Sequence, residues 1–161
     1  MKTEQLERYF KEYYDLVYRV AFAQIKSHAD TEDMLQEVFV RLLRYQPEFE
    51  SNEHEKAWMI RTTVNLCKDL IKSKWHSTTV NIDTVPEEEK AYFKVPFIEE
   101  DDTLWAVLEL PEKYKNCLYL FYYEDHSIRE IAQSLGMPEN TVKTNLRCGK
   151  KELKNIIKKV R

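Results

Sequence analysis

The chain has 161 residues and a formal net charge of −3, with 43% apolar and 33% charged residues. This length suits one ordinary domain or two small ones, and the apolar content is sufficient for a buried core, which excludes wholesale disorder. Only two glycines and five prolines are present, which disfavours a sheet-rich fold with many tight turns. The sequence therefore predicts an all-α fold.

Several functional classes are excluded by what the sequence lacks. The N-terminus shows no apolar signal segment, and the longest apolar run, 117–123, is too short to span a bilayer. The cysteines, at 67, 117 and 148, are too far apart for a zinc motif and too few for a disulfide framework. No glycine-rich phosphate loop or nucleophile–base pair stands out. We expect a cytoplasmic, non-catalytic protein with no metal, cofactor or small-molecule substrate.

Three helices are predicted in the first half of the chain. Apolar residues at helical spacing indicate a helix over 3–27. A second helix is expected to begin at Asp30 as its N-cap and to end at Pro47, with the apolar stripe Leu35, Val38, Phe39, Leu42 and Leu43. A polar loop over 46–55 precedes a third helix over about 55–74. One face of that helix is apolar, and another carries Arg61, Asn65, Lys68 and Lys72.

The middle of the chain has no steady hydrophobic period. Between residues 81 and 102 it contains eight acidic and two basic residues. Because a long aperiodic stretch is unusual inside a compact domain, we expect residues 77–102 to link two small helical domains, 1–76 and 103–161. A solvated surface loop would explain the charge equally well.

Helical periodicity returns after residue 102. The segment 103–110 predicts a short helix, and Pro111 suits the first position of the next one, whose apolar face is expected to hold Leu118, Phe121 and Tyr122.

The segment 127–151 predicts a helix-turn-helix. Ser127 and Glu130 have the spacing of a capping box, and Gly136 follows the apolar positions of the first helix, where a left-handed residue is expected. Pro138 suits the start of the second helix. Gly149 lies inside that helix, where glycine is unfavourable, so we expect a neighbouring helix to pack closely against it.

The second helix of such a motif inserts into the DNA major groove. Its outward residues are predicted to be Glu139, Asn140, Lys143, Thr144 and Arg147, which can read bases or hold phosphates. Residues 128–161 contain nine basic and three acidic residues, and such a local excess of positive charge favours phosphate contact. A capped helix pair with a basic surface can also arise from packing alone.

Two blocks of sequence resemble one family. The first is DTEDMLQEVFVRLLRY (30–45) followed by AWMIRTTVNLCKDLIKSK (57–74), and the second is LPEKYKNCLYLFYYEDHSIREIAQSLGMPENTVKTNLRCGKKEL (110–153). They resemble the second and fourth regions of bacterial sigma factors of the small extracytoplasmic-function (ECF) group of the sigma-70 family.

The resemblance implies partners and residue roles. The partners are core RNA polymerase, through its β′ clamp helices and β flap, promoter DNA, and an anti-sigma factor that can hold the chain at the inner membrane face. Core-binding residues would be Asp33, Gln36, Glu37, Phe39 and Val40. Contacts to the −10 element would come from Asn52, in a loop that receives a flipped base, and from Arg61, Asn65, Lys68 and Lys72. The −35 element would be bound by Ser127, Arg129, Glu139, Asn140, Thr141, Lys143, Thr144, Arg147 and Lys150.

The chain departs from the family pattern at three positions. Members often carry arginine where this chain has Asn145 and Cys148, and alanine where it has Gly149, which implies fewer phosphate contacts or a different −35 sequence. Two alternatives remain open: a two-domain regulator of the LuxR type, and a helical nucleic-acid- or protein-binding adaptor without promoter function. The D-x-x-Q-E-x-F and W…N…D helices of the first block argue against the LuxR type.

Overall fold

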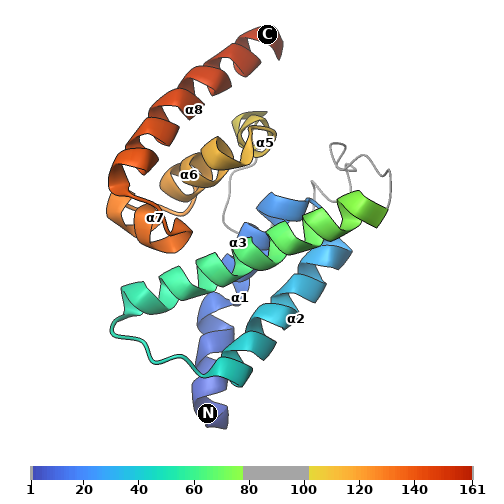
Figure 1. Cartoon of the computed structure of the whole chain (residues 1–161), viewed down its shortest axis with the longest axis vertical. Helices are drawn as coiled ribbons and strands as arrows, with labels where there is room; N and C mark the ends of the chain where they lie inside the picture. Colours follow the sequence, from blue (N-terminus) through green and yellow to red (C-terminus); the bar gives the residue numbers. More distant parts are fainter. Residues whose placement is uncertain (1, 78–101, 161) are drawn as a thin grey trace. The chain divides into compact units, whose positions relative to one another are not determined.

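The computed structural model describes residues 2–77 and 102–160, which are helical apart from the short connections between helices (Figure 1). The all-α prediction is confirmed for this part of the chain. Contacts divide the chain into two compact units, Met1–Phe93 and Lys94–Arg161, here called the first and second unit. Most of the predicted linker, 77–102, lies outside the described residues.

The first unit consists of α1 (Thr3–Ile25), α2 (His28–Tyr45) and α3 (Asn52–Ser77). Each of these helices packs against the other two. The most deeply buried side chains come from all three helices, so the apolar faces meet in one core. They include Val17, Ala21, Phe22, Val38, Leu42, Met59 and Ile60.

The starts of α2 and α3 differ from prediction because serines cap both helices. Ser27, and not Asp30, is the N-cap of α2, since its hydroxyl accepts a hydrogen bond from the Asp30 N–H at 3.4 Å. The Ser51 hydroxyl accepts from the His54 N–H at 3.1 Å, and α3 begins at Asn52. A serine hydroxyl satisfies an N–H that the helix itself leaves unpaired. Asn52, expected in a loop, therefore lies in the first turn of α3.

The second unit consists of α5 (Asp102–Leu108), α6 (Glu112–Tyr122), α7 (Ile128–Leu135) and α8 (Glu139–Val160). Pro111 precedes α6 as its N-cap residue and is not its first residue. Tyr122 is 46% exposed, so the predicted apolar face of α6 is wrong at this position. The helix instead buries Lys115, Asn116, Cys117, Leu118, Tyr119 and Leu120.

No helix within residues 2–77 and 102–160 has the length and apolar content needed to cross a membrane.

Candidate nucleic-acid interface

The helix-turn-helix of the second unit has the predicted local geometry. Ser127 Oγ accepts from the Glu130 N–H at 3.1 Å, and the Glu130 carboxylate accepts from the Ser127 N–H at 3.0 Å. Gly136 ends α7 in the left-handed region with φ 65° and ψ 43°, and its N–H donates to the Ala132 carbonyl. The capping box and the glycine turn are therefore confirmed, and together they fix where α8 begins relative to α7.

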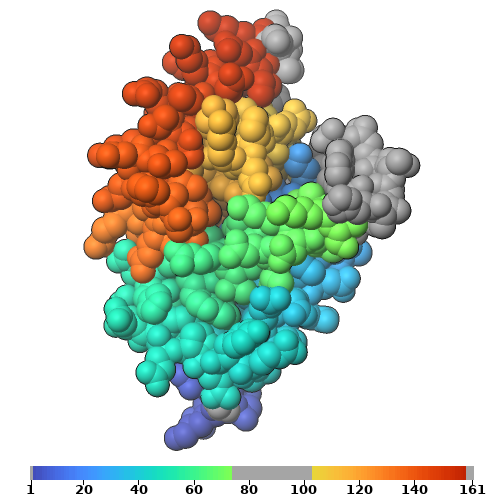
Figure 2. Space-filling model, in the orientation of Figure 1, coloured from blue at the N-terminus to red at the C-terminus, as the bar shows by residue number. Residues whose placement is uncertain are grey.

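The predicted outward face of α8 is exposed. Figure 2 shows α8, coloured orange to red, at the surface. Val142, Leu146 and Gly149 are buried on the opposite side. All the residues assigned to −35 contact have exposed side chains, namely Ser127, Arg129, Glu139, Asn140, Thr141, Lys143, Thr144, Arg147 and Lys150.

An open pocket of about 560 Å³ lies between α8 and the facing ends of α6 and α7. Its apolar lining comes from Phe121, Tyr122, Ile128 and Leu146, and its charged lining consists only of cations, Lys143, Arg147, Lys150, Lys151 and Lys154. The Lys150 ammonium lies 5.5 Å from the centre of the Tyr122 ring. Five cations without an acidic neighbour in the lining create a positive potential beside the outward face of α8. Sequence reasoning did not include Lys151, Lys154 or Tyr122 in this surface, although the basic run after Arg147 was a signal for the two lysines.

Asn145 does not lie on this face. It is 8% exposed, and its amide nitrogen lies 3.8 Å from Cys117 Sγ and 3.9 Å from Met137 Sδ. Burial raises the pKa of the Cys117 thiol, so the sulfur stays protonated and apolar in character. The departure from the family at Asn145 therefore concerns the core of the second unit, and phosphate contact is not expected from this buried side chain.

Four of the five residues assigned to −10 contact form a stripe along α3, and the fifth, Asn52, is exposed in the first turn of that helix outside the stripe. Arg61, Asn65, Lys68 and Lys72 are all exposed, and their spacing places them on one side of the helix. The other side is buried through Ala57, Ile60, Val64 and Cys67. The stripe carries three cations, as contact with a DNA strand requires.

The residues assigned to polymerase binding all lie on α2, and all but Phe39 have side chains that reach the surface. Asp33, Gln36 and Val40 are exposed, and Glu37 is half-buried with its carboxylate 3.8 Å from Arg41 Nε. Phe39 is only 6% exposed, and its ring centre lies 5.0 Å from that of Phe10 on α1. Phe39 is therefore mainly a core residue, because its side chain faces α1 and packs against the ring of Phe10.

Three apolar side chains of the packed helices α1 and α2 are exposed, and we call them together the α1–α2 patch: Phe10, Val40 and Leu43, which are 47%, 41% and 42% exposed. Leu43 was expected in the buried stripe, and Phe10 was not assigned to any site. Their helical spacing alone could not separate covered from uncovered positions.

A buried charge anchors α3 to α1. Glu55, 5% exposed, accepts a hydrogen bond from the Tyr13 hydroxyl at 2.6 Å and from the Arg8 guanidinium at 3.1 and 3.3 Å. Burial, followed by the hydrogen bond to Glu55, raises the pKa of Tyr13 well above its usual range. The hydrogen bond to Glu55 is also the main cause that raises the pKa of Arg8. A buried carboxylate is tolerated only when it is paired in this way, so the first turn of α3 is held at one place on α1.

A two-unit helical fold with a capped helix-turn-helix and cationic faces defines a class of DNA-binding transcription proteins. Comparison with known proteins specifies the class. The family described as Sigma-70 region 2 matches residues 9–77, and Sigma-70 region 4 matches residues 105–153. SigV of Bacillus subtilis, an RNA polymerase sigma factor, is 30% identical over 80% of this chain and 76% of its own length. The ECF sigma factor SigW of the same organism is 26% identical over 91% of this chain and 85% of its own length.

The chain belongs to the ECF group of the sigma-70 family. The fold agrees with two solved structures. Bartonella quintana RpoE, crystallised with the anti-sigma factor NepR, matches with a TM-score of 0.74 at 15% identity over 99% of this chain and the whole of that chain. CnrH, in complex with the cytosolic domain of CnrY, matches with a TM-score of 0.71 at 14% identity over 98% of this chain and 90% of that one. A LuxR-type regulator would not explain the region 2 match.

Proposed function

We propose that this sigma factor reads the −35 element with the outward face of α8 and the −10 element with the stripe on α3, while α2 binds core polymerase. The observation that carries the proposal is the face of α8, on which every assigned side chain is exposed and which continues into a pocket with only cationic charges. The protein acts by binding and not by catalysis. Melting of DNA follows if it binds the open strand more tightly than the duplex.

The −35 assignment can be tested once a promoter is in hand. Run-off transcription with core enzyme on genomic fragments would identify promoters. For a phosphate contact, Lys143→Ala should weaken promoter binding by the holoenzyme for all sequences and reduce the slope of log K against log salt by about 0.9. For a base contact, Arg147→Ala should relax specificity at one position at a cost of about 1–3 kcal/mol.

Lys113→Ala is the matched control for both variants, since Lys113 is an exposed lysine of α6 outside the pocket lining. The −35 assignment fails if Lys143→Ala and Arg147→Ala bind the promoter with the same affinity and salt dependence as Lys113→Ala.

The polymerase assignment rests on the exposed surface of α2 and the α1–α2 patch. Val40→Asp places a charge within this apolar surface, so co-purification with core polymerase should be lost. Lys143→Ala is the reciprocal control and should still co-purify. If the Val40→Asp variant still co-purified with core polymerase, the assignment of α2 to the polymerase interface would be wrong.

We also propose that the chain works in the cytoplasm and is held there, at the inner membrane face, by an anti-sigma factor. Support comes from family membership and from the structure of RpoE in complex with the anti-sigma factor NepR. Affinity capture of the tagged chain from membrane and soluble fractions, followed by identification of bound proteins, tests this proposal.

A further inference from the structure

The connection between α2 and α3, residues 46–51, is fixed at both ends (Figure 1). Gln46 ends α2 in the left-handed region with φ 41°, and its N–H donates to the Leu42 carbonyl at 3.0 Å. At the other end the Ser51 side chain caps α3. Only four residues lie between these two fixed points, which limits the paths that the backbone can take.

Phe49 anchors the middle of the connection. Its half-buried ring lies edge-on to three other rings, with centres 6.1 Å from Tyr9, 5.4 Å from His54 and 5.9 Å from Trp58. Edge-to-face arrangements at these distances are favourable. Because Tyr9 belongs to α1 and Trp58 to α3, the ring of Phe49 ties the connection to two helices at once.

His54 closes the connection through its imidazole. The Glu50 N–H donates to His54 Nδ1 at 3.1 Å, so Nδ1 is the unprotonated nitrogen of the ring. The neighbouring residue, Glu55, is the buried carboxylate held by Arg8 and Tyr13 of α1. The hydrogen bond therefore joins the connection to the turn of α3 that Glu55 anchors to α1.

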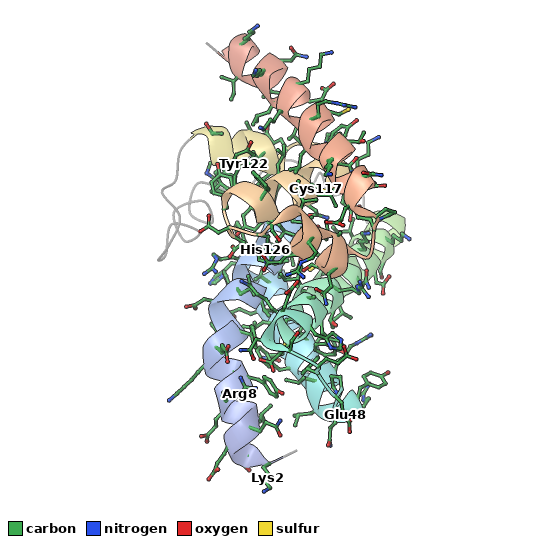
Figure 3. The ribbon with its side chains drawn as sticks, turned by 90° about the vertical axis from the view of Figure 1, so that its left-hand side faces the viewer. Lys2, Arg8, Glu48, Cys117, Tyr122 and His126 are labelled. Atoms are coloured by element: carbon green, nitrogen blue, oxygen red, sulfur yellow. The ribbon has the colours of Figure 1, made fainter. Side chains whose placement is uncertain are left out.

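The exposed side chains at this connection are polar. Glu48 and Glu50 of the connection are exposed, as is Asn52 at the start of α3, and Figure 3 labels Glu48 beyond the end of α2. Residues 46–55 contain four glutamates and neither lysine nor arginine. Glu55 is buried and paired with Arg8, but the exposed carboxylates of Glu48 and Glu50 repel phosphates, so contact of this segment with DNA is expected at base edges.

We propose that Phe49 and His54 are positioning residues for an unpaired base of the −10 element. They hold the connection in one conformation, so that the polar groups of Glu48, Glu50 and Asn52 meet the base edge without first being ordered. Preorganised groups discriminate better because no binding free energy is spent on ordering them. The inference rests on the proposed −10 role of this unit.

The experiment uses holoenzyme assembled from core polymerase and the full chain. Affinities are measured for single-stranded −10 oligonucleotides that carry each of the four bases in turn at each position. Affinity for a −35 duplex is measured in parallel. His54→Ala should reduce the ratio between the best and the worst base by about five-fold, the value of one ordinary hydrogen bond, and should leave −35 affinity unchanged.

Conservative variants separate positioning from folding. His54→Asn keeps an acceptor at the position of Nδ1 and should retain discrimination between bases. Phe49→Tyr keeps the aromatic ring and should also retain discrimination, whereas Phe49→Ala should lose it. His28→Ala changes a histidine of the same unit outside the connection and should behave as the wild type. If His54→Ala fails to fold, the comparison of His54→Asn with His54→Leu, which preserves side-chain bulk without an acceptor, replaces it.

Two outcomes would contradict the proposals, and the experiment tells them apart. If the wild-type holoenzyme does not discriminate among bases in the single strand, the proposed −10 role of the first unit fails, and the positioning inference fails with it. If the wild type discriminates and the His54→Ala and Phe49→Ala variants do so equally well, or if His54→Asn is no better than His54→Ala or His54→Leu, the positioning inference is overturned while the −10 role stands.

Discussion

Gly149→Ala is the most direct test of how α8 is held in the second unit. A Cβ atom at Gly149 would lie 2.9 Å from Leu118 Cδ1, 3.1 Å from Tyr114 Cβ and 3.3 Å from Leu118 Cγ. Ordinary contacts between carbon atoms are about 3.5–4.0 Å. The expected close packing against Gly149 is therefore confirmed, and α6 is the helix that approaches it.

Two opposing free energies decide the effect of the substitution on unfolding. Alanine is favoured over glycine inside a helix by about 1 kcal/mol. Forcing a methyl group into a filled core costs about 1–3 kcal/mol. Leu118 is 0% exposed, so its side chain has no open space into which to turn, and Tyr114 Cβ is fixed to the backbone. We expect the clash to dominate and the unfolding free energy of the second unit to fall by about 1 kcal/mol.

Native-state hydrogen exchange on the full chain measures this effect without assuming that both units unfold together. Amides of α6 and α8 report on the second unit, and amides of α1 and α3 are an internal reference that should not change. In a Leu118→Val background, which removes the nearest atom, Cδ1, the cost of Gly149→Ala should be smaller. Stabilisation by Gly149→Ala in the wild-type background would refute the argument, because the gain in helix propensity would then exceed the cost of the clash.

Three further predictions concern local features. Ser127→Ala removes the hydroxyl that accepts from Glu130 and should lower the unfolding free energy of the second unit by about 1 kcal/mol, seen as faster exchange of α7 amides. Tyr13→Phe leaves the buried Glu55 carboxylate without its 2.6 Å donor and should destabilise the first unit by about 1.5–3 kcal/mol at neutral pH. Because the pKa of Tyr13 is raised from its ordinary value of 10.0, the stability it contributes is fully present below pH 10 and is lost as pH rises further. The free energy of unfolding, measured by chemical denaturation between pH 8 and 11, should thus fall less with rising pH in the Tyr13→Phe variant than in the wild type. Asp125 has φ 54°, so Asp125→Val should lower the free energy of unfolding by about 1–2 kcal/mol. Asp125→Gly should not lower it, and chemical denaturation of both variants measures the difference.

Features that depend on residues close in sequence were predictable. The capping box joins residues three apart, and the left-handed turn depends on one glycine. The exposed faces of α3 and α8 follow from a helical period of apolar residues. For the same reason, Glu139, Asn140, Lys143, Thr144 and Arg147 were correctly expected on the outward face of α8, although the −35 roles came from the family resemblance and remain predictions.

Most features that depend on contacts between distant residues were not predictable; the close packing at Gly149 is the exception, because a glycine inside a helix is unfavourable unless packing requires it. Glu55 and Tyr13 are 42 positions apart, and no local pattern distinguishes this glutamate from its exposed neighbours. The stripe of α2 included both Phe39 and Leu43, but only packing against α1 decides that the first is covered and the second is not. The same holds for Tyr122, which belongs to the surface pocket because α8 leaves it uncovered.

Both glycines of the chain help to determine the position of α8 in the second unit. Gly136 sets the direction in which α8 leaves α7, because its left-handed conformation, which glycine adopts without strain, ends α7 there. Gly149, thirteen residues later, sets how closely α8 approaches α6. Lys143 and Arg147 lie between these two points, so their positions relative to DNA depend on both. Gly149→Ala should therefore weaken −35 binding by more than the loss of folded protein accounts for. Even in the molecules that remain folded, the displaced helix α8 holds Arg147 at a different position.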